Sequence, residues 1–165
     1  MEGSLRGQLL IASPGLVDYF RRTVVLVLEH NEDGAMGVVL NRPTDTAVAE
    51  AVPDLADLAG HDALVHAGGP VDPDAVLALG DVDGSPELLA PDDTDLEPSR
   101  LRVFAGYTGW APGQLDGEIE EEAWITTPAE PDDAFAESDL WPEVLQRKGG
   151  TYALMATMPV DPTLN

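Results

Sequence analysis

A chain of 165 residues has the length of one domain, and we expect residues 1–165 to form a single compact unit with a substantial core. Hydrophobic residues make up 44% of the chain and cysteine is absent, which argues against a disordered chain and excludes disulfides, thiolate catalysis and thiolate metal sites. The formal net charge of -23 argues against direct nucleic-acid binding, because a phosphate backbone is held largely by cationic side chains.

The N-terminal residues and the apolar runs of the sequence indicate where in the cell the protein is expected to lie. No basic segment followed by an apolar core opens the chain, and no apolar run approaches the roughly 20 residues that span a bilayer. We therefore expect a cytoplasmic protein without membrane contact. The acidity is explained by a solvated surface that keeps the protein soluble, by a high-salt habitat or by a basic partner.

A hairpin near the N-terminus is the strongest structural signal. A continuous β-branched run predicts a strand at residues 24–28 that is covered on both faces. Asp33-Gly34 then predicts a tight turn, because glycine accepts a positive φ, and residues 35–40 form the return strand. Gly37 inside that strand indicates a bulge or a close approach of two backbones.

The rest of the chain alternates between short elements. Pro112 and Pro142 suit the first turns of helices, Ser138 suits a helix N-cap and Gly149 a C-terminal stop. Residues 81–98 are a polar excursion rich in Pro and Asp. Further strands are expected at residues 7–12, 63–67, 75–79, 101–105, 124–127 and 151–158, and helical segments at 16–20, 44–59 with a break at Pro53, 112–122, 132–137 and 138–148.

The residue types that perform catalysis form no recognisable motif. The three histidines, His30, His61 and His66, make no His-x-x-x-His pair, and neither a metal nor another cofactor is expected. His30 ends the first hairpin strand, where it is either a general base or the partner of a structural hydrogen bond. No Gly-x-Ser-x-Gly occurs, and carboxylate pairs arise by chance among 31 acidic residues, so no catalytic residue is predicted.

Three of the eight basic residues, Arg21, Arg22 and Arg42, lie close to the hairpin in sequence. Arg42, with Asn41 beside it, could hold an anionic ligand through a bidentate contact. It could also pair with a carboxylate of the same molecule. Internal pairing is the favoured interpretation, because a buried guanidinium without a partner is costly.

Two glycine-containing blocks are further candidate surfaces. Gly68-Gly69 before a proline either reverses the chain or forms a ligand loop, and chain reversal is favoured. Tyr107 and Gln114 flank a glycine-rich stretch that could line a groove or an interface. Trp110, between them, is expected to anchor the core beneath the following helix.

Several blocks resemble the YqgE/AlgH family of small bacterial proteins. They follow the order of that family and span nearly the whole chain. The blocks are residues 7–14, residues 20–43, Gly-Gly-Pro-Val at 68–71, Arg-Val-Phe-Ala-Gly-Tyr-Thr-Gly-Trp-Ala-Pro-Gly-Gln-Leu at 102–115, Trp124 after an acidic helix, and Trp141 with the helix around it.

The resemblance implies an α+β fold, with one compact domain whose mixed sheet wraps into a barrel-like core and whose short helices pack outside. Members of the family are often labelled transcriptional regulators because of a genetic link to alginate production. No biochemical activity is agreed for the family, so no catalytic residue is transferred to this chain. The acidity and the lack of cysteine argue against direct DNA binding and thiol chemistry here.

Two functional hypotheses result. The first is a non-enzymatic binding or regulatory protein that acts through a protein partner and affects transcription indirectly. The alternative is a small-molecule or anion-binding protein, or an enzyme acting on such a ligand, whose site lies near Asn41, Arg42 and a loop at residues 106–110. The candidate binding residues are His30, Asn41, Arg42, Gly68, Gly69, Tyr107 and Gln114.

Overall fold

The computed structural model describes residues 4–16, 20–60, 62–89, 98, 100–136 and 139–157. In this part of the chain, nine strands make one mixed sheet in the order β4-β5-β8-β3-β2-β1-β9, and β6 pairs with both β7 and β8. The strands are β1 (Gln8–Ala12), β2 (Val24–Asn31), β3 (Gly34–Val39), β4 (Pro43–Ala47), β5 (Leu64–Ala67), β6 (Val71–Val82), β7 (Ser85–Leu89), β8 (Leu101–Trp110) and β9 (Trp124–Pro128).

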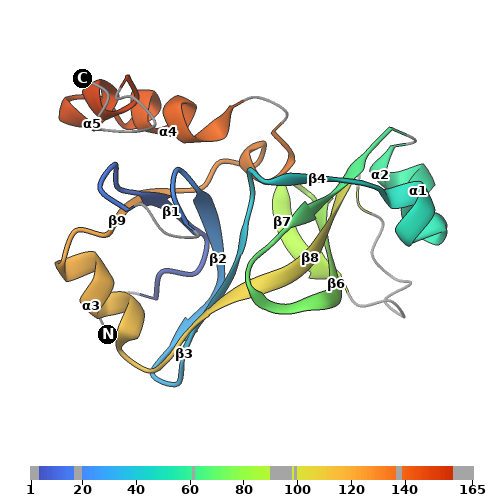
Figure 1. The fold of residues 1–165 in the computed structure, drawn as a ribbon, viewed down its shortest axis with the longest axis horizontal. Helices are drawn as coiled ribbons and strands as arrows, with labels where there is room; N and C mark the ends of the chain where they lie inside the picture. The colour runs from blue at the N-terminus through green and yellow to red at the C-terminus, as the bar shows by residue number, and fades with distance from the viewer. Residues whose placement is uncertain are drawn as a thin grey trace.

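Short helices lie outside the sheet (Figure 1). They are α1 (Val48–Ala51), the 3-10 turn η1 (Pro53–Leu55), α2 (Ala56–Ala59), α3 (Gln114–Glu120), the 3-10 turn η2 (Asp133–Phe135), α4 (Leu140–Lys148) and α5 (Thr151–Met155). Helices α4 and α5 run along one side of the molecule above β1 and β9, whereas α1 and α2 lie at the opposite end from α3. The α+β prediction with a mixed sheet is confirmed, although the sheet is open rather than closed into a barrel.

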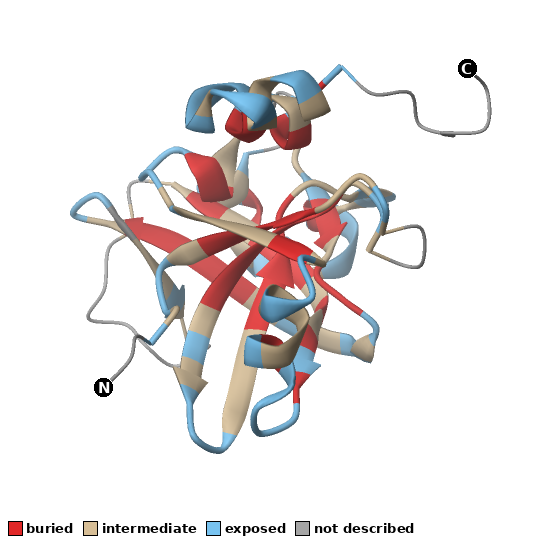
Figure 2. Cartoon of the chain, turned by 90° about the vertical axis from the view of Figure 1, so that its left-hand side faces the viewer, coloured by how far each residue is buried: buried red, intermediate tan, exposed pale blue. Residues whose placement is uncertain are grey.

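The apolar runs of β1 and β2 are covered on both faces, as the sequence predicts. Leu9 and Val24 belong to a core cluster that also holds Trp141 of α4. Their neighbours Leu10 and Val25 point to the other face and pack with residues of α3, including the buried Leu115. Figure 2 shows the same arrangement, with buried residues on the inner sides of the helices and exposed residues on the outer sides. Alternation along a strand places successive side chains in two different cores.

The β2–β3 hairpin has both the bulge and the close backbone approach that Gly37 indicates. The register shifts between Val27 and Glu29, which is a β-bulge in β2 opposite this glycine. A Cβ atom at Gly37 would lie 2.5 Å from the carbonyl oxygen of Leu26. The bulge bends β2 and changes the direction in which the side chains after Val27 point.

The Gly-Gly-Pro turn carries the chain across β8. Strand β5 runs parallel to β8 along one edge, with His66 opposite Phe104, and β6 runs antiparallel along the other edge. The connection between them therefore passes over the backbone of β8. A Cβ atom at Gly69 would lie 2.2 Å from the carbonyl oxygen of Tyr107, and one at Gly106 would lie 2.5 Å from that of Gly69. Backbones approach this closely only where side chains are absent.

Three segments differ from the sequence-based expectation. Residues 151–158 are predicted as a strand, but Thr151–Met155 is helix α5, because Gly149-Gly150 ends α4 and lets a second helix fold back with Tyr152 and Met155 against the core. Strand β8 continues to Trp110, so residues 106–110 are not a loop. The polar excursion begins as a hairpin, in which β7 pairs with β6.

Two more predictions are wrong at their N-terminal ends: residues 44–47, predicted as helical, belong to strand β4, which pairs with β5, and the strand predicted at 75–79 is β6, which begins at Val71. The other predicted elements lie within one to three residues of the observed ones in the described part of the chain. Within it, no helix is both long and apolar enough to cross a membrane. Some sequence-based assignments lie outside the described residues: residues 17–19 of the helical turn, His61, residues 90–97 of the polar excursion, the N-cap at Ser138, and the last residue of the strand predicted at 151–158.

Candidate functional site

His30 lies near the turn of the hairpin and connects three elements. Its Nδ1 accepts a hydrogen bond from the backbone N–H of Leu5 at 2.9 Å, and its Nε2 lies 3.6 Å from Oδ1 of Asp116 in α3. Because Nδ1 is an acceptor, the proton of the neutral ring is on Nε2 and faces the carboxylate. The ring thus joins the N-terminal arm, β2 and α3.

Asn41 and Arg42 fasten the loop that precedes β2. The side chain of Asn41 accepts from the N–H of Val24 at 3.0 Å and donates to the carbonyl of Arg22 at 2.9 Å. Arg42 donates from Nη2 to the carbonyl of Arg21 at 3.0 Å. The guanidinium of Arg22 stacks 4.2 Å from the ring of Trp141, which fixes the same loop to α4.

The remaining four candidates lie in the crossing and on α3. Gly68 and Gly69 form the connection over β8, and Tyr107 beside them donates from its hydroxyl to Asp72 at 3.4 Å. Gln114 opens α3, where its Oε1 accepts from the N–H of Ala111 at 2.9 Å.

The structure does not bring the seven candidates into one site. His30 lies at the turn of the β2–β3 hairpin, whereas Asn41 and Arg42 follow its open end. Each polar side chain among them makes at least one hydrogen bond within the protein. Their roles in binding a ligand or partner stay predictions.

Glu118 is the centre of a polar network that the sequence analysis did not identify. Its Oε1 accepts from the indole N–H groups of Trp110 and Trp124, at 3.0 and 2.9 Å, and its Oε2 accepts from Gln114 at 2.9 Å. One carboxylate thus joins α3 to β8 and β9. The only signal in the sequence is an acidic residue placed between two tryptophans.

Three arginines converge on η2. Arg147 makes a bidentate contact with the buried Asp133, at 3.0 and 2.8 Å. Arg100 bridges Asp81 and Asp132, and Arg102 donates to carbonyls of η2 and its neighbours. Hydrogen bonds that the guanidinium groups donate raise the pKa of Arg100 and of Arg147 above the ordinary value, mainly the bond to Asp132 for Arg100 and the bond to Asp133 for Arg147. These arginines anchor an acidic turn to the sheet and to α4.

Two hollows of similar size open on the surface of the described structure. The hollow that we name the first groove has a volume of about 760 Å³, and the second groove has about 790 Å³. The first groove lies between β2 beyond its bulge, β7, and the segment before η2; its lining residues are Arg6, Gly7, Leu26, Val27, Leu28, Glu29, His30, Asn31, Met36, Gly84, Pro86, Glu87, Leu88, Ala129, Glu130 and Pro131.

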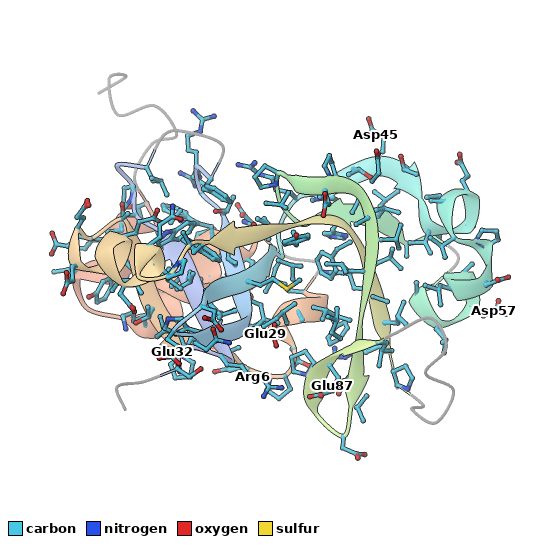
Figure 3. The ribbon with its side chains drawn as sticks, turned by 90° about the horizontal axis from the view of Figure 1, so that it is seen from below. Arg6, Glu29, Glu32, Asp45, Asp57 and Glu87 are labelled. Carbon is cyan, nitrogen blue, oxygen red and sulfur yellow. The ribbon has the colours of Figure 1, made fainter. Side chains whose placement is uncertain are left out.

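The lining of the first groove mixes apolar and charged residues. Leu26 and Val27 are buried and belong to cores on opposite faces of the sheet, and Leu88 on β7 is 44% exposed at the wall of the groove. In Figure 3, Glu29, Glu87 and Arg6 lie near one another at this part of the molecule, far from Asp45 and Asp57. Sequence reasoning missed this groove because its walls are distant in sequence; the bulge opposite Gly37 was the one local signal.

The second groove collects basic groups and Asn41. It lies between the start of β8, the buried His66 of β5, and Phe135, Ala136 and Asp139. Nδ1 of His66 lies 3.1 Å from the carbonyl of Leu64, and Arg100 and Arg102 border the groove while holding η2. Asp62 and Asp139 are the acidic residues in its lining.

A metal centre finds no support in the described residues. No group of three or more His, Cys, Asp or Glu side chains among them could hold an ion. The polar side chains among the candidate residues are engaged in hydrogen bonds within the fold.

Comparison with known proteins matches the AlgH-like family model over residues 9–153. A UPF0301 protein of Streptomyces coelicolor is 44% identical, with 98% of this chain and 96% of the relative covered. A UPF0301 protein of Mycobacteroides abscessus is 42% identical, with 96% and 87% covered.

Two solved structures share the fold. The crystal structure of protein DIP2367 from Corynebacterium diphtheriae matches with a TM-score of 0.84 and 29% identity, covering 95% of this chain and 94% of that one. The solution structure of the AlgH protein from Pseudomonas aeruginosa matches with a TM-score of 0.72 and 29% identity, covering 96% and 98%. The family match, the relatives and the shared fold together establish that this chain belongs to the AlgH-like family of UPF0301 proteins.

Proposed function

We propose that this protein is a non-enzymatic binding protein of the cytoplasm that acts by holding a segment of a protein partner in the first groove. The observation that carries the proposal is an open hollow of about 760 Å³ that is lined by charged residues and by apolar ones, among them Met36 and the exposed Leu88. Concave sites that combine apolar side chains with a few polar groups are common recognition sites. Any effect on transcription is then indirect and is exerted through the partner.

The engagement of the basic residues supports a protein partner over nucleic acid. Arg100, Arg102 and Arg147 hold η2, and Lys148 donates to the carbonyl of Thr126 at 2.9 Å. With a formal net charge of -23, the molecule repels a phosphate backbone.

Affinity capture with paired leucine variants tests the proposal. Leu88 on β7 lines the groove and is 44% exposed, whereas Leu154 on α5 is 69% exposed and lies outside its lining. Leu88→Asp and Leu154→Asp each add one negative charge at an exposed leucine. We expect the wild type and Leu154→Asp to capture the same partner from a lysate of the source organism, and Leu88→Asp to lose it.

Mapping by hydrogen exchange completes the test. The captured partner should slow amide exchange at residues 26–31 and 87–88, which line the groove from β2 and β7. A partner that Leu88→Asp still retains, or protection confined to another face, would contradict the proposal.

The second groove favours the alternative of a small-anion site. Arg100, Arg102 and the buried His66 border one hollow together with Asn41. Thermal unfolding with inorganic phosphate tests this alternative, because a ligand at one hundred times its Kd stabilises the native state by about 2.7 kcal/mol. A phosphate shift that His66→Gln abolishes would support it. An equal shift from chloride at matched ionic strength would instead reflect screening of the carboxylates.

A further inference from the structure

We propose that β9 is a self-association surface, on which a second copy of this chain adds its own β9 and continues the sheet across a two-fold axis. The proposal goes beyond the first groove, because no residue of β9 belongs to the lining of that groove. Three observations carry it: the hydrogen-bonding groups that β9 directs outward, its lack of charge, and the symmetry of an antiparallel pair of identical strands.

Strand β9 is the last strand of the sheet and pairs only with β1. At one end of this pair, the N–H of Ser13 donates to the carbonyl of Ala123 at 3.0 Å. Bonded and non-bonded residues alternate along an antiparallel pair, so the odd-numbered residues of β9 bond to β1 and the backbone groups of Trp124 and Thr126 face outward. Lys148 confirms this direction, because its ammonium group reaches the carbonyl of Thr126 from α4 at 2.9 Å.

The outward groups of β9 are available to a further strand. The N–H groups of Trp124 and Thr126 find no acceptor in the described part of the chain. The carbonyl of Thr126 has a second lone pair beside the one that Lys148 occupies. Outward backbone groups of this kind form a template for pairing with another chain.

The other two edge strands of the described sheet carry features that block pairing. Strand β4 begins with Pro43, carries the exposed Asp45, and shifts its register against β5. Strand β7 contains Pro86, which has no N–H, followed by Glu87. Strand β9 has the sequence Trp-Ile-Thr-Thr-Pro, without a charge and with its proline only at the last position. Since prolines, charges and bulges are the usual protection of an edge strand, β9 is the edge on which pairing is least hindered.

A second copy suits this edge because the outward groups of β9 match themselves. With Thr126 on the two-fold axis, the two Thr126 residues exchange a pair of backbone hydrogen bonds. The N–H of each Trp124 then meets the carbonyl of Pro128 of the other copy, which needs no N–H to accept this bond. A charged residue near the axis would face its own like charge, whereas β9 places threonine opposite threonine, which is a favourable pair.

Helix α5 adds an apolar surface next to this edge. It lies above β9 in Figure 1 and carries Leu154, whose side chain is 69% exposed. The two-fold axis of an antiparallel pair is perpendicular to the sheet, so α5 of both copies would lie on the same face. The formal net charge of -23 on each copy opposes the association, and we therefore expect the dimer to form more readily at high salt.

Sedimentation velocity on the intact protein tests the proposal. The measurement covers increasing protein concentration in about 1 M sodium chloride, where the Debye length falls to about 3 Å. Thr126→Asp places two carboxylates opposite each other across the axis. The control is Thr46→Asp, which adds the same charge at an exposed position of the β4 edge. We expect the wild type and Thr46→Asp to form dimers, and Thr126→Asp to dimerise at least about tenfold more weakly.

Residue-resolved amide exchange locates the interface without any substitution. Between low salt and about 1 M salt, the amides of Trp124 and Thr126 should slow by about tenfold once about nine-tenths of the protein is dimeric. The amides of Ile125 and Thr127 already bond to β1 and should change little. A general stabilisation of the monomer by salt would not produce this alternation.

Monomers at every concentration in high salt would overturn the proposal. A dimer that Thr126→Asp and Thr46→Asp weaken equally would also overturn it, because general acidity and not β9 would then govern the association. A dimer in which the amides of Trp124 and Thr126 exchange as fast as in the monomer would place the interface elsewhere and would refute the pairing of β9.

Discussion

Alanine at Gly106 should destabilise the fold through the crossing of the β5–β6 connection over β8. Gly106 has a φ of +78°, and a Cβ atom there would lie 2.5 Å from the carbonyl oxygen of Gly69 and 3.1 Å from that of Val71. The left-handed conformation costs alanine about 1–2 kcal/mol. Forcing a methyl group against packed backbone costs about 1–3 kcal/mol more. We therefore expect Gly106→Ala to lower the free energy of unfolding by about 2–5 kcal/mol.

Gly84 provides the matched control. It has a φ of +86°, and a Cβ atom there would meet no atom within 4 Å. Gly84→Ala should therefore cost only the conformational part, about 1–2 kcal/mol. The difference between the two variants isolates the close contact in the crossing.

Equilibrium urea unfolding followed by tryptophan fluorescence measures both variants. With an m-value of about 2 kcal/mol/M, the midpoint of Gly106→Ala should lie about 0.5–1.5 M below that of Gly84→Ala. Midpoints that correspond to stabilities within about 0.5 kcal/mol of each other would refute the reasoning, because the crossing would then tolerate a side chain.

Three further changes test other contacts by the same unfolding assay. Asn41→Ala removes two hydrogen bonds to the loop before β2 and should lower the free energy of unfolding by about 2 kcal/mol. Asn31→Ala, at an exposed position, should lower it by about 0.5 kcal/mol. Equal losses would contradict the view that Asn41 fastens this loop. Asp133→Asn disrupts a bidentate pair at a side chain that is 5% exposed and should cost about 2 kcal/mol. Asp132→Asn, whose side chain is 87% exposed, should change stability by less than about 0.5 kcal/mol. Equal losses, or a larger loss for Asp132→Asn, would contradict the expectation that the buried pair is the stronger one. Glu118→Ala leaves two indole N–H groups without their acceptor, so it should lower the free energy of unfolding by about 2–4 kcal/mol and shift the tryptophan emission. Glu118→Gln keeps one acceptor oxygen and should lower the free energy of unfolding by less. Unchanged emission in Glu118→Ala would contradict the network.

Local patterns in the chain were sufficient to predict much of the secondary structure. The β2–β3 hairpin follows from a β-branched run, an Asp-Gly turn and a returning apolar run, all within about twenty residues of sequence. The C-terminal end of α4 follows from Gly149 after the basic last turn. These signals depend on neighbours in sequence, so no knowledge of the fold is needed to interpret them.

Tertiary contacts overrode the local pattern at α5. Residues 151–155 contain no helix cap and no long amphipathic repeat, and a short apolar run of this kind suits a strand or a buried helical turn equally. The Gly149-Gly150 break allows the chain to turn back on α4, where Tyr152 and Met155 reach the core. The packing surface that favours the helix is supplied by distant residues.

The candidate site shows the same division between local and distant information. The sequence by itself determined the family resemblance, the hairpin, the acidity and the glycines that a close backbone approach requires. Only the tertiary structure decided that these glycines serve a crossing over β8, that Asn41 and Arg42 fasten a loop, and that β2 and β7 form the walls of one groove. The physical reason is that strand pairing joins residues separated by tens of positions, and which side chains then face a common hollow depends on sheet order and on one bulge.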